Sequence, residues 1–191
     1  MKHLLHNSLI SSGISVPSNI PNILITHITC DSREVDRGSL FLGLPGVRVD
    51  GGSFWQEAFD RGAVAAIIGS NAAKLNPPRS KDSVIVISSD VSKYIGELAS
   101  VFWDIPSSKM TTIGVTGTNG KTTVTHIIEH LSKSMGVPSA LFGTLENRWP
   151  NHSQIASHTT TFSIELQHQL ASALTAGSKL AVMEVSSHAL D

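Results

Sequence analysis

The chain has 191 residues, of which 40% are hydrophobic and 15% charged, enough apolar material for one or two globular domains and too little charge for a disordered chain. A formal net charge of −1 gives no electrostatic reason to expect nucleic acid or an anionic membrane as a partner. A single cysteine, Cys30, excludes an internal disulfide, and no stretch approaches the ~20 apolar residues that cross a bilayer. The start of the chain shows no signal-peptide pattern, so we expect a cytoplasmic protein, and we expect it to be monomeric.

The first half of the chain predicts a small α/β domain. Two continuous apolar runs, AVAAII and VIVI, are typical of strands buried on both faces of a parallel sheet. A weakly alternating segment and the short apolar run SLFLGL indicate two earlier strands. In chain order we expect strands at residues 23–29 and 39–44, a helix at 51–61, strands at 63–68 and 84–87, and a helix at 91–103.

The segment IPSSK at residues 105–109 follows the last of these helices and precedes a new strand, so we place a domain boundary there, with domains at 1–106 and 107–191. The second domain is expected to contain strands at 111–115, 137–142 and 180–185, with helices after the first two. This order predicts a parallel sheet with right-handed crossovers. Three strands are too few for a complete nucleotide-binding domain. We therefore expect a truncated domain with an exposed apolar sheet edge and poor solubility.

The strongest functional signal is the segment GVTGTNGKTT at residues 114–123, which lies between a predicted buried strand and a helix. This is the context of a phosphate-binding loop, in which Gly117 and Gly120 let backbone N–H groups point at phosphate oxygens. Lys121 would contact the β- and γ-phosphates, and the Thr122 hydroxyl would bind Mg²⁺. Val115 departs from the general P-loop pattern, which has its first glycine there. The sequence predicts binding of ATP and Mg²⁺.

Four motifs in order resemble the Mur ligase family. The loop residues resemble the G-T-N-G-K-[ST] motif of these ligases and of their folylpolyglutamate synthetase relatives; they are Gly117, Thr118, Asn119, Gly120, Lys121, Thr122 and Thr123. The segments DSR at 31–33, GSLF at 38–41 and VDG at 49–51 resemble the UDP-binding amino-terminal domain of the MurE and MurF branches. HTT at 158–160 and EVSSH at 184–188 resemble segments of the MurE branch.

This resemblance implies an α/β UDP-precursor-binding domain followed by the first part of a P-loop ATPase domain with a parallel sheet. It also implies an ATP-dependent amide ligase of peptidoglycan synthesis. Such an enzyme adds the third amino acid to UDP-MurNAc-L-Ala-D-Glu; this amino acid is usually meso-diaminopimelate and in some bacteria L-Lys, and the sequence alone does not decide between them. A substrate carboxylate takes the γ-phosphoryl group of ATP to give an acyl phosphate, and an amine then displaces phosphate. This chemistry needs positioning and charge neutralisation more than a protein nucleophile.

The resemblance assigns roles to individual residues. Lys121 and Glu184 are the catalytic candidates, and Thr122 and Glu184 are the candidates for Mg²⁺ binding at the end of a parallel strand. The substrate candidates are Cys30, Ser32, Val47, Arg48, Val49, His158, Thr159, Thr160 and Ser186. The family's carbamylated lysine, second metal-site histidine, adenine-binding segment and carboxy-terminal domain have no counterpart up to Asp191. We therefore expect no ligase activity from the chain as given.

Several other interpretations of the sequence are open. The alternatives are a MurF-type or folylpolyglutamate-type ligase, or a non-catalytic module that binds UDP precursors. A P-loop switch protein would need a Walker-B aspartate and switch loops, which we do not find. His126, Glu129 and His130 match the H-x-x-E-H zinc-protease pattern. However, an apolar stripe on the same predicted helix (Val124, Ile127, Ile128, Leu131 and Met135) places these three on a solvated face. Cys30 is expected to be a small buried residue, and Phe54, Trp55 and Phe59 are expected in the core.

Overall fold

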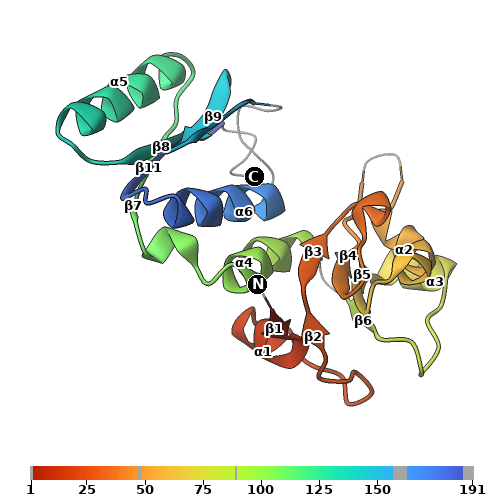
Figure 1. Cartoon of the computed structure of the whole chain (residues 1–191). Coiled ribbons are helices and arrows are strands. Elements are labelled where there is room, and N and C mark those ends of the chain that lie inside the picture. Colours follow the sequence, from red (N-terminus) through yellow and green to blue (C-terminus); the bar gives the residue numbers. More distant parts are fainter. Residues whose placement is uncertain (1, 47–48, 89, 157–162, 187–191) are drawn as a thin grey trace. The chain divides into compact units, whose positions relative to one another are not determined.

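The computed structural model describes all residues except 1, 47–48, 89, 157–162 and 187–191 (Figure 1). The chain forms two compact units, Met1–Phe102 and Trp103–Asp191. Both units are α/β, as the sequence predicts. In the part of the chain that the structure describes, no helix has the length and apolar character needed to span a bilayer.

The first unit is built around a four-stranded sheet in the order β3-β4-β5-β6, with every neighbouring pair parallel. The apolar runs predicted as strands buried on both faces form β5 and β6; β5 is buried as predicted, whereas Val86 of the edge strand β6 is 43% exposed. A two-stranded antiparallel sheet of β1 and β2 precedes it. The elements are β1 His3–Leu4, α1 Leu5–Ser11, β2 Leu24–Ile25, β3 His27–Thr29, η1 Ser32–Glu34, β4 Ser39–Leu42, η2 Gly51–Phe54, α2 Trp55–Arg61, β5 Ala65–Gly69, α3 Ser70–Leu75, β6 Val84–Ile87 and α4 Ser92–Phe102.

Two predictions about this unit are wrong in detail. The single strand expected at residues 23–29 is divided into β2 and β3, because β2 pairs with β1 and β3 pairs with β4. The helices α1 and α3 were not expected, since each has only two turns and a weak apolar pattern. The α1 helix packs against α4.

One face of the first sheet is covered by α2 and α3 (Figure 1). The core there includes Phe41 of β4, Trp55 and Ala58 of α2, and Ile68 of β5, all at most 4% exposed. Trp55 also donates through its ring N–H to the carbonyl oxygen of Asn76, so its polar atom is satisfied. Phe54 is 43% exposed, contrary to the expected core position, because it ends the one-turn segment η2 before α2 begins.

The second unit contains a five-stranded sheet in the order β10-β9-β8-β11-β7. The strands β7, β11 and β8 are parallel, as predicted, and β8, β9 and β10 are joined antiparallel. Within the described residues β7 is the last strand at its side of the sheet. The elements are η3 Pro106–Ser108, β7 Thr111–Val115, α5 Lys121–Ser134, β8 Ser139–Phe142, β9 Glu146–Trp149, β10 His152–Ile155, α6 Ser163–Thr175 and β11 Leu180–Glu184.

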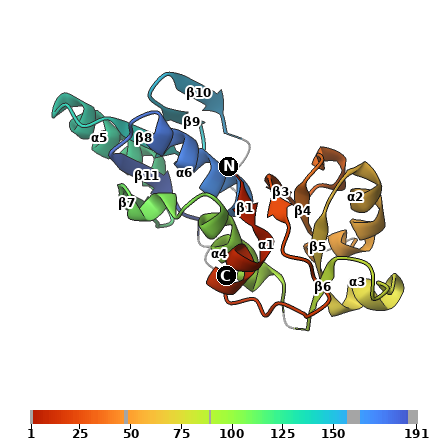
Figure 2. The same ribbon diagram turned by 60° about the horizontal axis from the view of Figure 1, so that its bottom comes forward.

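Successive side chains along the strands of this sheet pack alternately into two apolar clusters. Leu141 and Val182 belong to one cluster with Ile128 of α5, and Phe142 and Ala181 belong to the other with Leu170 of α6. Side chains of successive strand residues point to opposite faces, so each strand supplies both clusters. Figures 1 and 2 accordingly show α5 and α6 on opposite sides of β8 and β11.

The β9–β10 hairpin was not expected, and the prediction of only three strands is therefore wrong. Its strands, ENRW and HSQI, are polar, so they lack the apolar run that identified the other strands; β10 is exposed, whereas β9 is partly buried. Its turn contains Asn151 at φ 64°, a left-handed conformation that asparagine tolerates. Register pairs Trp149 with His152, whose rings stack with centroids 4.1 Å apart.

The helix α5 is turned differently from the prediction. Glu129, expected on a solvated face, is 2% exposed, whereas Ile127, Leu131 and Met135 of the expected buried stripe are 52%, 56% and 79% exposed. The reason is Arg148 on the unexpected strand β9, whose Nε donates to Glu129 Oε1 at 2.9 Å, with Lys133 adding a second cation at 2.6 Å. Burial raises the pKa of Glu129, but these bonds outweigh it and hold the pKa below its ordinary value.

This orientation predicts opposite outcomes for two polar substitutions on α5. Glu129→Gln should lower the free energy of unfolding by about 3 kcal/mol, because it leaves Arg148 facing a partner without charge. Leu131→Gln should change it by less than about 0.5 kcal/mol, because that side chain is exposed. Urea unfolding of the purified chain measures both. A larger loss for Leu131→Gln than for Glu129→Gln would show that the apolar stripe faces the sheet.

Candidate functional site

The predicted phosphate loop joins the carboxyl end of β7 to the start of α5. Gly117 and Gly120 have φ angles of 146° and 80°, conformations that residues with a side chain adopt only with strain. The loop residues Thr118 and Asn119 are exposed, and Lys121 begins the 14-residue helix α5. The free N–H groups and the positive end of the helix dipole therefore face the loop, where an anion would be stabilised.

Lys121 lies over this loop. Its Nζ donates to the carbonyl oxygen of Gly117 at 2.7 Å, so the ammonium group is held at the mouth of the loop. No acidic residue is paired with Lys121 among the ion pairs of the described residues. The ammonium group can therefore exchange one backbone contact for a phosphate oxygen without breaking a salt bridge.

Glu184 and Thr122, predicted from separate motifs, lie in direct contact. The Thr122 hydroxyl donates to Glu184 Oε2 at 2.9 Å. Glu184 is the last residue of β11 and is 1% exposed, and Val115, the last residue of β7, is its partner in the parallel register. The carboxyl ends of two adjacent parallel strands thus bring the carboxylate to the first turn of α5.

Two residues that the sequence did not single out hold this carboxylate. Thr144 donates its backbone N–H to Glu184 Oε1 at 3.0 Å and its hydroxyl to Glu184 Oε2 at 3.1 Å. A Cβ on the preceding Gly143 would lie only 2.4 Å from Glu184 Oε1, so a side chain there would displace the carboxylate. Their position directly after β8, at the carboxyl end of a parallel strand, is the signal that could have identified them.

The residues at this site fit a magnesium ion. Glu184 and Thr122 present one carboxylate and one hydroxyl oxygen, the hard ligands that Mg²⁺ prefers, and phosphate oxygens and water ordinarily complete its shell. Ser186 follows at the same sheet edge and is half-buried. Thr123, also in the first turn of α5, is exposed.

In the first unit, Cys30 and Ser32, the candidates that the resemblance places at the uridine end of the substrate, follow β3, and the candidate Val49 follows β4. Asp31 accepts a bond from the backbone N–H of Arg33 and pairs with its guanidinium at 2.6 Å, which shapes the one-turn segment carrying Ser32. These bonds from Arg33 lower the pKa of Asp31 to about 2. Cys30 is exposed, contrary to the expected burial, because it sits where β3 leaves the sheet. Val49 is 56% exposed.

Some predicted substrate residues lie outside the described part of the chain. They are Val47, Arg48, His158, Thr159 and Thr160. Their roles stay predictions.

The zinc-protease pattern on α5 does not assemble a metal site. Glu129 is engaged by Arg148 and Lys133, and His126 Nδ1 lies 2.8 Å from the carbonyl oxygen of Thr122. Among the described residues, no three His, Cys, Asp or Glu side chains form a group that could hold a metal ion. The prediction that all three side chains lie on a solvated face is wrong for Glu129, which is buried, whereas His130 is exposed.

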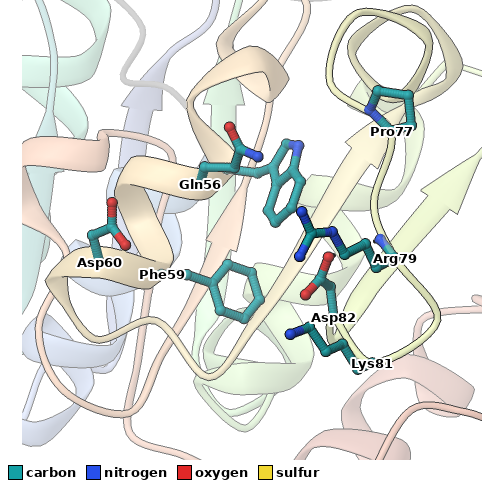
Figure 3. Close-up of a pocket in the computed structure, with 8 residues that line it drawn as sticks. Gln56, Phe59, Asp60, Pro77, Arg79, Lys81 and Asp82 are labelled. Atoms are coloured by element: carbon teal, nitrogen blue, oxygen red, sulfur yellow. Dashed lines mark hydrogen bonds between the residues drawn. The ribbon is translucent and has the colours of Figure 1, made fainter.

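A pocket of about 490 Å³ in the first unit lies away from the predicted uridine residues. It is formed by α2 and the loop before β6, and Figure 3 shows Phe59 pointing toward Asp82 and Lys81. That loop enters the amino end of a parallel strand, whereas ligands of such sheets bind at the carboxyl ends. We therefore do not place the uridine site in this pocket.

The chain matches two family descriptions: "Mur ligase family, catalytic domain" over residues 24–103 and "Mur ligase middle domain" over residues 115–191. Curated relatives named UDP-N-acetylmuramoyl-L-alanyl-D-glutamate--2,6-diaminopimelate ligase include those of Synechococcus sp. (strain WH7803), 58% identical over 191 residues, and Thermosynechococcus vestitus, 45% identical over 190 residues. Each alignment covers 100% of this chain but only 38% and 37% of the respective relative.

Solved structures share the fold. A ligase of the same name has a TM-score of 0.76 at 24% identity, covering 100% of this chain and 37% of that chain. The MurF ligase from Thermotoga maritima in complex with ADP has a TM-score of 0.56 at 24% identity, over 84% of this chain and 32% of that chain.

The close approach at Gly143 yields a prediction about Glu184. Gly143→Ala should lower the free energy of unfolding by about 1–3 kcal/mol, because it pushes a buried carboxylate away from its donors. Gly69→Ala is a matched control, since a Cβ there meets its nearest atom at an ordinary 3.5 Å. Urea unfolding measures both variants. Equal stability of the two would show that Glu184 is not held against Gly143.

Proposed function

The chain belongs to the Mur ligase family, and on this premise we propose that it forms part of the ATP-dependent ligase that adds diaminopimelate to UDP-MurNAc-L-Ala-D-Glu. The observation that carries the proposal is the contact of Thr122 with Glu184 beside the Lys121 loop. The names of the curated relatives at 45–58% identity support diaminopimelate rather than lysine as the amino acid added. The chain spans about 38% of the length of those relatives, so this activity is proposed for the whole protein.

We assign residues 1–106 to a domain that binds the UDP precursor and 107–191 to the first part of the ATP-binding domain. Ser32 and Cys30 would contact the uracil end, with Val47, Arg48 and Val49 covering the nucleotide. Thr159 and Thr160, with His158 and Ser186, would hold the sugar and peptide. The protein would act in the cytoplasm as a monomer, where the nucleotide precursor and ATP are both present.

In the proposed reaction, a carboxylate oxygen of the D-Glu residue attacks the γ-phosphorus of ATP, and the bond to the bridging oxygen breaks to release ADP. The amine nitrogen of diaminopimelate then attacks the acyl carbon, phosphate leaves with the bonding electrons, and the nitrogen loses a proton. Lys121 is placed to neutralise charge on the phosphate oxygens. Glu184 and Thr122 would hold Mg²⁺, which supplies further neutralisation when bound.

The MurF type and the folylpolyglutamate type are the alternative ligases. MurF structures from Acinetobacter baumannii and Thermotoga maritima share the fold at TM-scores of 0.56–0.62. The segment that begins with Glu184 and continues through Ser186 favours the MurE branch on the resemblance described above. A binding module without catalysis would engage the UDP precursor through the first unit alone.

Binding to the purified chain tests this proposal. UDP-MurNAc-L-Ala-D-Glu at a hundred times its Kd should stabilise the wild-type chain by about 2.7 kcal/mol, and Ser32→Ala should reduce this gain. Mg·ATP should likewise stabilise the chain, and Lys121→Ala should abolish the gain, while Lys133→Ala serves as a control at the far end of α5. Thermal unfolding monitored by circular dichroism measures each shift.

The two ligands separate the alternatives. A folded chain that responds to Mg·ATP through Lys121 but not to the UDP compound would exclude the MurE assignment and favour the folylpolyglutamate type. A response to the UDP compound alone would favour the binding module.

A further inference from the structure

A continuous chain of side-chain hydrogen bonds begins at the turn that holds Glu184. Asn147 of β9 accepts a bond from the Gly143 N–H through its Oδ1, at 3.1 Å. Its Nδ2 donates to Gln169 Oε1 on α6 at 3.3 Å, and Gln169 Nε2 donates to Glu165 Oε1 at 2.8 Å. Asn147 and Gln169 are each 3% exposed. The chain therefore links Gly143, which is buried at the start of the turn after β8, to the exposed Glu165 in the first turn of α6, through two amides that lie in the low-dielectric interior.

Burial makes these bonds consequential. A buried amide that loses a partner costs more free energy than the same amide in water, so Asn147 has little freedom to rotate. Because its Oδ1 holds the Gly143 N–H, it fixes the direction of the peptide between Phe142 and Gly143, directly before the peptide that carries the Thr144 N–H. The next N–H in the chain, that of Thr144, donates to Glu184 Oε1. Asn147 thus makes no contact with the predicted ATP site itself. It orients the turn whose Thr144 N–H donates to Glu184.

We propose that Asn147, supported by Gln169 and Glu165, is a positioning residue that fixes the Gly143–Thr144 turn and through it holds the Glu184 carboxylate against Thr122. Its importance for Mg·ATP binding rests on the proposed function. The positioning itself is a property of the free protein. Helix α6, which has no residue in the phosphate loop, thereby contributes to the geometry of the carboxylate.

Each amide in this series donates to the next side chain, from Asn147 to Gln169 and from Gln169 to Glu165. This order of donors and acceptors gives a specific rescue experiment. Asn147→Asp keeps the acceptor for the Gly143 N–H but places an oxygen against Gln169 Oε1, so the link to α6 breaks. Adding Glu165→Gln reverses the polarity of the link. Gln169 can then turn its amide, donate to the new aspartate and accept from the new glutamine. In the double variant, positions 147 and 165 together carry the same formal charge as in the wild type.

The measurement is native-state hydrogen exchange of the Thr144 amide in the ¹⁵N-labelled chain, expressed relative to the Val182 amide in the core of β11. The ratio of the two protection factors cancels any loss of global stability, because such a loss affects both amides equally. Asn147→Ala and Asn147→Asp should each lower the relative protection of Thr144 by about tenfold, the equivalent of one buried hydrogen bond. Asn147→Asp combined with Glu165→Gln should return it to within about twofold of the wild type.

Ser139→Ala is the matched control. It removes a buried hydroxyl that has no hydrogen-bond partner at the opposite end of β8, and it should leave the relative protection of Thr144 unchanged. Equal losses at Thr144 and Val182 in the Asn147 variants would show a merely structural role and overturn the proposal. Failure of Glu165→Gln to rescue Asn147→Asp would also overturn it.

The Kd of Mg·ATP, measured by calorimetry on the same variants, should rise about tenfold in Asn147→Ala. If the wild-type chain binds no Mg·ATP at all, the proposed role of the phosphate loop in this chain fails. The exchange ratio of Thr144 still decides the positioning role in that case.

Discussion

The buried carboxylate of Glu184 imposes the strongest constraint on the second unit. At 1% exposure it has almost no access to water, so its charge must be met by donors within the protein. Thr122 supplies one from α5 and Thr144 supplies two from the turn after β8. The three segments can converge only if β7, β8 and β11 are parallel and end together. The parallel register and the site are therefore two consequences of one requirement.

The same geometry explains why the predicted ligand residues of both units lie where they do. In each unit the connections that leave the carboxyl ends of parallel strands carry them: the turn after β3 in the first unit, and the phosphate loop and the end of β11 in the second. Loops at this edge stand beside helix N-termini, whose free N–H groups favour anions. UDP precursors and ATP are both polyanions, which suits this edge of each sheet.

The orientation of α5 shows how a charge can override an apolar pattern. Turning Ile127 and Leu131 toward the sheet would bury more apolar surface, but it would expose Glu129 and separate it from Arg148. In the structure the ion pair of Glu129 with Arg148 is retained. Of the apolar stripe on α5, only Ile128 packs against the core cluster beneath the helix. The exposed stripe is an apolar surface on α5, and its pattern in the sequence did not indicate which face it occupies.

The sequence by itself determined the α/β class, the parallel strands and the phosphate loop, because each depends on local patterns: continuous apolar runs and glycines at a turn. The pairing of Thr122 with Glu184, 62 positions apart, was implied by the resemblance to the Mur ligases and not by a local pattern. Tertiary structure decided the rest. The β9–β10 hairpin has no apolar run, and it brings in both Arg148, which turns α5, and Asn147, which supports the turn at Gly143. The roles of Gly143, Thr144 and Asn147 arise from contacts between residues up to 40 positions apart. Such contacts leave no periodic signal in one sequence, since they are set by which strands become neighbours and not by local propensity.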